Sequence, residues 1–128
     1  MASVSVRYIV DDVNLAIDFY AGLLEFEVVM HPAPPFAMLK RGDLMLLLSQ
    51  PSGQGGGGQT LADGSSPEPG GWNRFQIQVD DVDAEFERLT AAGATFRSEV
   101  IRGVGGDQAL LEDPSGNLVE LFQFKSNA

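Results

Sequence analysis

Residues Tyr8–Leu24 read YIVDDVNLAIDFYAGLL, and residues Phe75–Gly93 read FQIQVDDVDAEFERLTAAG. Both stretches contain the tetrapeptide VDDV, preceded by a short alternating segment and followed by apolar residues at helical spacing. The acids Asp11-Asp12 and Asp80-Asp81 stand at the expected helix starts, where a carboxylate caps free amides and complements the helix dipole. The sequence therefore predicts a duplicated strand–helix unit in which these four acids are structural.

Each predicted helix is followed by three candidate strands. They lie at residues 27–30, 36–41 and 44–50 in the first half and at 96–101, 108–112 and 118–124 in the second. The last two strands of each half are joined by turn-forming residues, Gly42-Asp43 and the segment DPSGN at 113–117, which favour hairpins. Each half reads βαβββ, and the chain as a whole predicts an α+β fold.

The two halves are interpreted as modules of a single domain, residues 1–128. The first module covers about 1–50 and the second about 72–128, and the glycine- and proline-rich segment 51–71 links them. A module of about 60 residues buries little surface alone, so the two sheets are expected to join as one curved mixed sheet around a cleft.

The composition excludes several classes of function. The chain has 128 residues and a formal net charge of −10, which repels phosphate backbones, so nucleic acid is not an expected partner. It contains no cysteine, which removes disulfides, thiolate metal sites and a cysteine nucleophile. The longest wholly apolar run, 44–48, is far too short to cross a bilayer, and no signal peptide is visible. A cytoplasmic protein without a membrane partner is expected.

The segment Gly53–Gly58 formally matches the pattern G-x-G-x-x-G. A dinucleotide fingerprint must open a helix within a βαβ unit, whereas the residues that follow have no helical period and include two prolines. We interpret this segment as part of the linker and as a mobile flap beside the cleft, not as a nucleotide site.

The strand that precedes each helix has an apolar face and a polar face, because side chains alternate across a strand. The apolar faces are expected to pack on the helices, and the polar faces are expected to line the cleft. In the first strand Val4, Val6, Tyr8 and Val10 oppose Ser3, Ser5, Arg7 and Ile9, and in the second half Phe75, Ile77 and Val79 oppose Arg74, Gln76 and Gln78.

Two motifs add a family resemblance to this layout: YIVDDVNLAIDFYAGLLEFEV at 8–28 and LLEDPSGNLVELFQ at 110–123. With the double βαβββ pattern, they resemble the vicinal oxygen chelate superfamily, also called the glyoxalase, bleomycin-resistance and extradiol-dioxygenase superfamily. The resemblance covers nearly the whole chain. It implies a cleft in which metal-dependent members hold a divalent ion through His and Glu side chains, one from each of four strands.

Three of the four ligand positions that the resemblance implies carry other residues here. The first falls on Ser5, the second at about Leu47 and the third on Arg74, and only the fourth is kept, as Glu120. A guanidinium is neither a metal ligand nor tolerant of a nearby cation, so we predict no metal and no cofactor. The single histidine, His31, is interpreted as an ordinary loop residue.

An ion pair between Arg74 and Glu120 is expected in place of the metal. An arginine in a cleft offers planar bidentate donors to a carboxylate or phosphate, while Glu120 ties it down or accepts from an amine or hydroxyl of the ligand. In the alternative interpretation, the two residues only neutralise each other and seal a degenerate pocket.

Three functions therefore stay open. The first is metal-independent binding of a drug or metabolite, as in the bleomycin-resistance branch, with a cationic aromatic ligand steered by the negative charge. The second is a glyoxalase- or dioxygenase-type lyase, isomerase or oxygenase with a divalent metal, in which Glu120 is the catalytic base, although a neighbouring arginine makes it a weak one. The third is a stress-related accessory module with a vestigial cleft.

The first function uses residues on both predicted modules. The expected ligand-binding residues are Ser5, Arg7, Leu47, Trp72, Arg74, Gln76, Glu120 and Phe122, with Phe36 as a further stacking surface. The family resemblance also implies a homodimer, with which a short chain and free strand edges are compatible.

Overall fold

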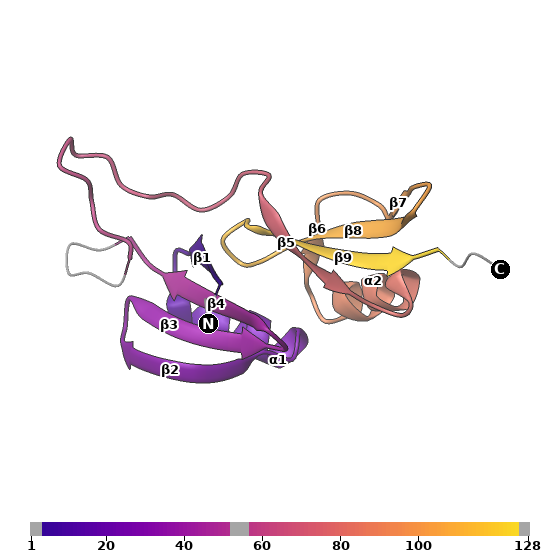
Figure 1. The fold of residues 1–128 in the computed structure, drawn as a ribbon, viewed down its shortest axis with the longest axis horizontal. Helices are drawn as coiled ribbons and strands as arrows, with labels where there is room; N and C mark the ends of the chain where they lie inside the picture. Colours follow the sequence, from indigo (N-terminus) through magenta and orange to yellow (C-terminus); the bar gives the residue numbers. More distant parts are fainter. Residues whose placement is uncertain (1–3, 52–56, 126–128) are drawn as a thin grey trace. The chain divides into compact units, whose positions relative to one another are not determined.

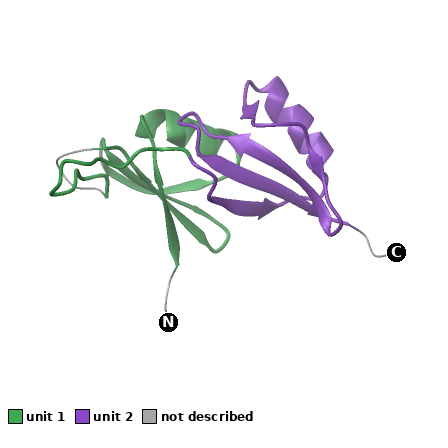
Figure 2. Ribbon diagram, turned by 90° about the horizontal axis from the view of Figure 1, so that it is seen from above, with its two compact units in different colours: residues 1–70 green, residues 71–128 purple. Residues whose placement is uncertain are grey.

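The computed structural model describes residues 4–51 and 57–125. The chain divides into two compact units, Met1–Gly70 (unit 1) and Gly71–Ala128 (unit 2), each with its own sheet and helix (Figure 2). The α+β fold of two βαβββ modules is thereby confirmed, and most of the predicted linker falls in unit 1. No helix in the described ranges is long and apolar enough to cross a bilayer.

Unit 1 is a four-stranded sheet with one helix (Figure 1). Its elements are β1 (Ser5–Ile9), α1 (Val13–Leu23), β2 (Glu27–Ala33), β3 (Phe36–Arg41) and β4 (Leu44–Ser49). The strand order is β1-β4-β3-β2, in which β1 runs parallel to β4 and the other pairs are antiparallel. The helix α1 contacts β2, β3 and β4.

Unit 2 repeats this plan with one strand broken (Figure 1). Its elements are β5 (Arg74–Gln78), α2 (Val82–Ala91), β6 (Thr95–Phe96), β7 (Ile101–Arg102), β8 (Gly106–Glu112) and β9 (Leu118–Phe124). The strand order is β5-β9-β8-β6, with β5 parallel to β9, and β7 also pairs with β8.

The prediction of one continuous strand at 96–101 is wrong, because β6 ends at Phe96 and β7 begins only at Ile101. Both short strands pair with β8, where their partners are Leu111 and Gln108. The segment from Phe96 to Ile101 is two residues longer than the segment of β8 that faces it. A regular ladder of strand hydrogen bonds cannot accommodate these two extra residues, so the backbone leaves the sheet between Phe96 and Ile101, as it does at a β-bulge.

Both helices begin with the same capping arrangement, which confirms the structural role of two of the four acids. Asp12 and Asp81 are the N-caps, and their side chains accept from the backbone N–H groups three residues on. The amide of the first helical residue, Val13 or Val82, donates to a glutamine, Gln50 directly after β4 in unit 1 and Gln123 on β9 in unit 2. The duplicated VDDV motif therefore produces a duplicated helix start.

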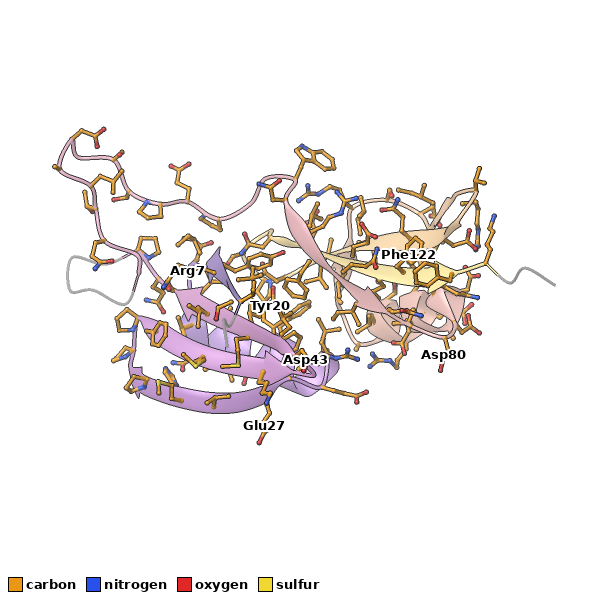
Figure 3. All side chains as sticks on the ribbon, in the orientation of Figure 1. Arg7, Tyr20, Glu27, Asp43, Asp80 and Phe122 are labelled. Carbon is orange, nitrogen blue, oxygen red and sulfur yellow. The ribbon has the colours of Figure 1, made fainter. Side chains whose placement is uncertain are left out.

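The apolar strand faces pack on the helices as predicted, with one exception. Tyr8 and Val10 are buried in unit 1, and Phe75 and Ile77 are buried in unit 2. Val4 was expected on the same apolar face, but it is 77% exposed because β1 starts only at the next residue. In unit 1 the buried ring of Tyr20 contacts the rings of Phe19 and Phe26 edge to face (Figure 3).

The two predicted hairpins are present. Gly42 adopts a φ of 57°, and the loop has only two residues, which is the pattern of a type II′ turn. In the second hairpin, Asp113 is only 4% exposed, and its carboxylate accepts from the backbone N–H groups of Ser115 and Asn117 and from the Asn117 amide. This carboxylate holds the turn from which β9 starts.

Candidate functional site

The strand register places ten side chains of β5, β8 and β9 on one face of the sheet of unit 2. Paired residues of neighbouring strands project to the same side, and the opposite side carries the buried residues Phe75, Ile77, Val119 and Leu121. The helix α2 contacts β8 and β9 and lies on one side of the sheet (Figure 2). We call the side away from α2 the Arg74 face; it comprises Arg74, Gln76, Gln78, Gln108, Leu110, Glu112, Leu118, Glu120, Phe122 and Phe124, of which Leu110 and Leu118 are buried.

Arg74 lies at the centre of a hydrogen-bonded cluster on this face. Its Nε donates to Glu120 Oε1 at 2.9 Å, and its Nη2 donates to Gln108 Oε1 at 3.1 Å. Its Nη1 donates to the backbone carbonyl of Trp72 at 3.3 Å. The other carboxylate oxygen of Glu120, Oε2, accepts from Gln76 Nε2 at 2.7 Å. Both ends of the ion pair are therefore held by uncharged partners as well as by each other.

The ion pair between Arg74 and Glu120 expected from the sequence is present, and it is partly shielded from water. The Arg74 side chain is 27% exposed and that of Glu120 is 12% exposed. A charged pair at this depth interacts more strongly than a fully solvated surface pair, and separating it would leave a carboxylate with little access to water. Arg74 and Glu120 thus carry one positive and one negative charge that neutralise each other.

Trp72 is held beside this cluster by a second arginine. The guanidinium carbon of Arg97 lies 4.7 Å from the centroid of the Trp72 ring, which is a cation–π contact. Arg97 also donates to Glu112 at 3.0 Å and to the carbonyls of Gly71 and Gly116. Trp72 nevertheless remains 67% exposed, so its ring offers an aromatic surface on a fixed support.

Phe122 forms the apolar part of the Arg74 face, on β9 (Figure 3). It is half-buried and contacts the ring of Phe124 edge to face. A side chain at Gly106 would collide with the Phe122 ring, so this glycine makes room for the ring above β8.

The remaining predicted ligand-binding residues lie in unit 1. Ser5 and Arg7 are on β1, and Leu47 is the register partner of Arg7 on β4. Arg7 donates to the hydroxyl of Ser49 at 2.8 Å (Figure 3). The backbone of Gly57 lies against the Arg7 guanidinium, where no side chain would fit.

The glycine-rich match Gly53–Gly58 lies mostly outside the described residues. In the part that the structure does describe, from residue 57 to the start of β5, there is no helix. A dinucleotide fingerprint would require one at this point.

A comparison with protein families finds one match, and it spans nearly the whole chain. The model of the Glyoxalase/Bleomycin resistance protein/Dioxygenase superfamily matches residues 3–121. The chain belongs to this superfamily. A comparison with curated protein sequences finds no significant match.

Solved structures of this superfamily share the fold. A superfamily member from Sphaerobacter thermophilus is 27% identical, covers 96% of this chain and 97% of its own, and gives a TM-score of 0.75. A lactoylglutathione lyase from Agrobacterium tumefaciens is 26% identical over 95% of this chain and 92% of its own, with a TM-score of 0.72. TnmS3, an antibiotic binding protein from a Streptomyces species, is 24% identical over 98% of this chain and 97% of its own, with a TM-score of 0.71.

The residues that the family resemblance assigns to metal-ligand positions do not fit a divalent ion. Ser5, Leu47 and Arg74 supply no imidazole or carboxylate, and the single carboxylate, Glu120, already binds a guanidinium at 2.9 Å. Among the described residues, no group of three or more His, Cys, Asp or Glu side chains is placed to hold a metal ion. His31 lies on β2 and is exposed.

Two features of this superfamily member were not predicted from its sequence. Gln108 is a partner of Arg74, and Arg97 supports Trp72. Side chains alternate along the strand predicted at 108–112, which places Gln108 and Glu112 on one face of β8. This alternation could have indicated that Gln108 is a candidate partner of Arg74. No such signal marks Arg97, because it lies where the predicted strand is interrupted.

Proposed function

We propose that this superfamily member binds a small organic molecule, a drug or a metabolite, at the Arg74 face without a metal ion. The observation that carries the proposal is the state of Glu120. Its two carboxylate oxygens accept from Arg74 Nε and Gln76 Nε2, and the positive charge of the guanidinium, 2.9 Å away, would repel a metal ion at the same carboxylate.

The groups on and beside this face suit an organic ligand. Small-molecule sites combine apolar and aromatic surface with a few placed polar groups. Here Phe122 and the exposed ring of Trp72 supply aromatic surface, and the cluster around Arg74 supplies fixed donors and acceptors. TnmS3, which has this fold, is an antibiotic binding protein, and this is compatible with sequestration of a drug.

An enzyme is the second candidate, because the lactoylglutathione lyase from Agrobacterium tumefaciens shares the fold at 26% identity. In that case Glu120 would be the catalytic base. Both of its oxygens already accept a hydrogen bond, from Arg74 Nε and Gln76 Nε2, so a substrate proton would have to compete with these donors. The geometry therefore favours binding over catalysis.

The proposal predicts that Arg74→Ala abolishes ligand-induced stabilisation. A library of small organic molecules, screened against protein treated with EDTA, should yield compounds that raise Tm. At about 100 times Kd, a ligand stabilises the folded state by about 2.7 kcal/mol, which raises Tm by several degrees. In Arg74→Ala this rise should vanish, because the cluster loses its central donor.

The matched control is Arg88→Ala, which removes an arginine of α2 that pairs with Glu85. Each variant is compared with its own ligand-free Tm, so a general loss of stability does not count. If Arg74→Ala responded to every ligand as strongly as the wild-type protein does, the assignment of the site to this face would be wrong.

A further inference from the structure

The guanidinium of Arg74 has a partner at each of its three nitrogens. Nε binds Glu120, Nη2 binds Gln108, and Nη1 binds the Trp72 carbonyl. All N–H groups of a guanidinium lie in its plane, and a carboxylate ligand approaches along that plane. These bonds use three of the five N–H groups, so a carboxylate at the other two would share the guanidinium with Glu120 and place a second negative charge beside it. A flat ring that stacks on the guanidinium adds no charge and displaces no partner.

The charges of this cluster also argue against an ionic ligand. An anion that captured Arg74 would leave Glu120, only 12% exposed, without its cation. A cation at Glu120 would lie beside the guanidinium of Arg74, whose positive charge repels it. The net charge of −10 attracts cations at long range, but salt screens that attraction at physiological ionic strength.

The other charged side chain of the Arg74 face, Glu112, is paired with Arg97. Gln76 uses its N–H to bind Glu120, which leaves its carbonyl as an acceptor for a ligand. Gln108 uses its carbonyl to bind Arg74, which leaves its N–H groups as donors. Phe122, the register partner of Gln108, is half-buried and adds apolar surface, whereas Leu110 is only 6% exposed.

From these contacts we infer that the ligand is an uncharged planar aromatic molecule with a carbonyl, hydroxyl or amide on its rim. Its ring stacks on the guanidinium plane of Arg74, and its rim forms hydrogen bonds with Gln76 and Gln108. This inference rests on the proposed function and specifies the ligand class, which differs from the cationic ligand that the net charge suggests.

Three probes that share a naphthalene ring and differ in charge test this inference. Naphthalene carboxamide is neutral, naphthalene carboxylate is an anion, and naphthylmethylammonium is a cation. Each is titrated into the full chain by calorimetry at neutral pH. We expect the carboxamide to bind about tenfold more tightly than either ion, and its Kd to change little when the salt concentration is raised.

Arg74→Lys tests the stacking itself, because lysine keeps the charge and loses the plane. The carboxamide should bind this variant about tenfold more weakly, whereas Arg88→Lys on α2 should bind it as the wild-type protein does. Melting curves of both variants establish that they are folded.

The possible outcomes separate the inference from the proposed function. Tighter binding of either ion overturns the inference and leaves the proposed function standing. Binding of none of the three probes overturns both. Unchanged affinity of Arg74→Lys for the carboxamide overturns the stacking on Arg74, and with it the inference.

Discussion

Glu120→Gln is expected to reverse the charge preference of the Arg74 face. The substitution keeps the size of the side chain and its hydrogen-bonding oxygen, but it removes the charge that neutralises Arg74 at 2.9 Å. The guanidinium then becomes an uncompensated cation, to which an anionic ligand can bind. A hydrogen bond to a charged group contributes about 1.5–3 kcal/mol, so naphthalene carboxylate should bind at least about tenfold more tightly than to the wild-type protein.

Glu85→Gln is the matched control for this prediction. It causes the same change in net charge, but it lies on α2, where Glu85 pairs with Arg88. A gain confined to Glu120→Gln would support a local effect on Arg74. An equal gain in both variants would instead indicate that the net charge of the chain governs the affinity, and the account of the cluster would fail.

The second large effect is expected in stability, from Asp113→Ala. The Asp113 carboxylate is nearly fully buried and accepts from the Ser115 N–H, the Asn117 N–H and the Asn117 amide, at 2.9, 2.9 and 3.1 Å. Its removal leaves buried donors without these acceptors, which costs about 1–3 kcal/mol for each such group. A loss of about 3 kcal/mol in the free energy of unfolding is expected from urea denaturation.

Asp63→Ala is the control that separates the effect of burial on the free energy of unfolding from the effect of local hydrogen bonds. Asp63 also accepts from the backbone N–H two residues on, that of Ser65, and from the Ser65 hydroxyl, but this turn is exposed to water. These hydrogen bonds lower the pKa of Asp63 below its usual value. Because water replaces them after substitution, a change below about 0.5 kcal/mol is expected. Equal losses in the two variants would contradict the role given to burial.

The duplicated fold could be predicted because its signals are local. Asp12 and Asp81 act on amides three residues away, and the hairpin turns act on their own neighbours. The interruption between β6 and β7 could not be predicted, because it depends on a mismatch in length with β8, a strand that lies later in the chain. The alternation of apolar residues within one segment contains no information about the length of the strand that pairs with it.

Part of the candidate site could likewise be predicted from the sequence, and part could not. Arg74 and Glu120 could be named from the family resemblance, and the parallel pairing of β5 with β9 places Gln76 beside Glu120. The part played by Gln108 could not be named, because it depends on how far the arginine side chain reaches across β9 to β8. Ser5, Arg7 and Leu47 keep their predicted place on β1 and β4 in unit 1, and their contribution to ligand binding stays a prediction.

The central claim is that the Arg74–Glu120 ion pair stands where relatives hold a metal, and that an organic ligand binds without one. The most direct measurement titrates naphthalene carboxamide into two samples, one stripped with EDTA and one incubated with nickel, zinc, iron and manganese, with elemental analysis of both. We expect Kd values within about twofold of each other and far less than one metal ion per chain. One tightly bound divalent ion per chain, or binding seen only in the metal-treated sample, would contradict the claim.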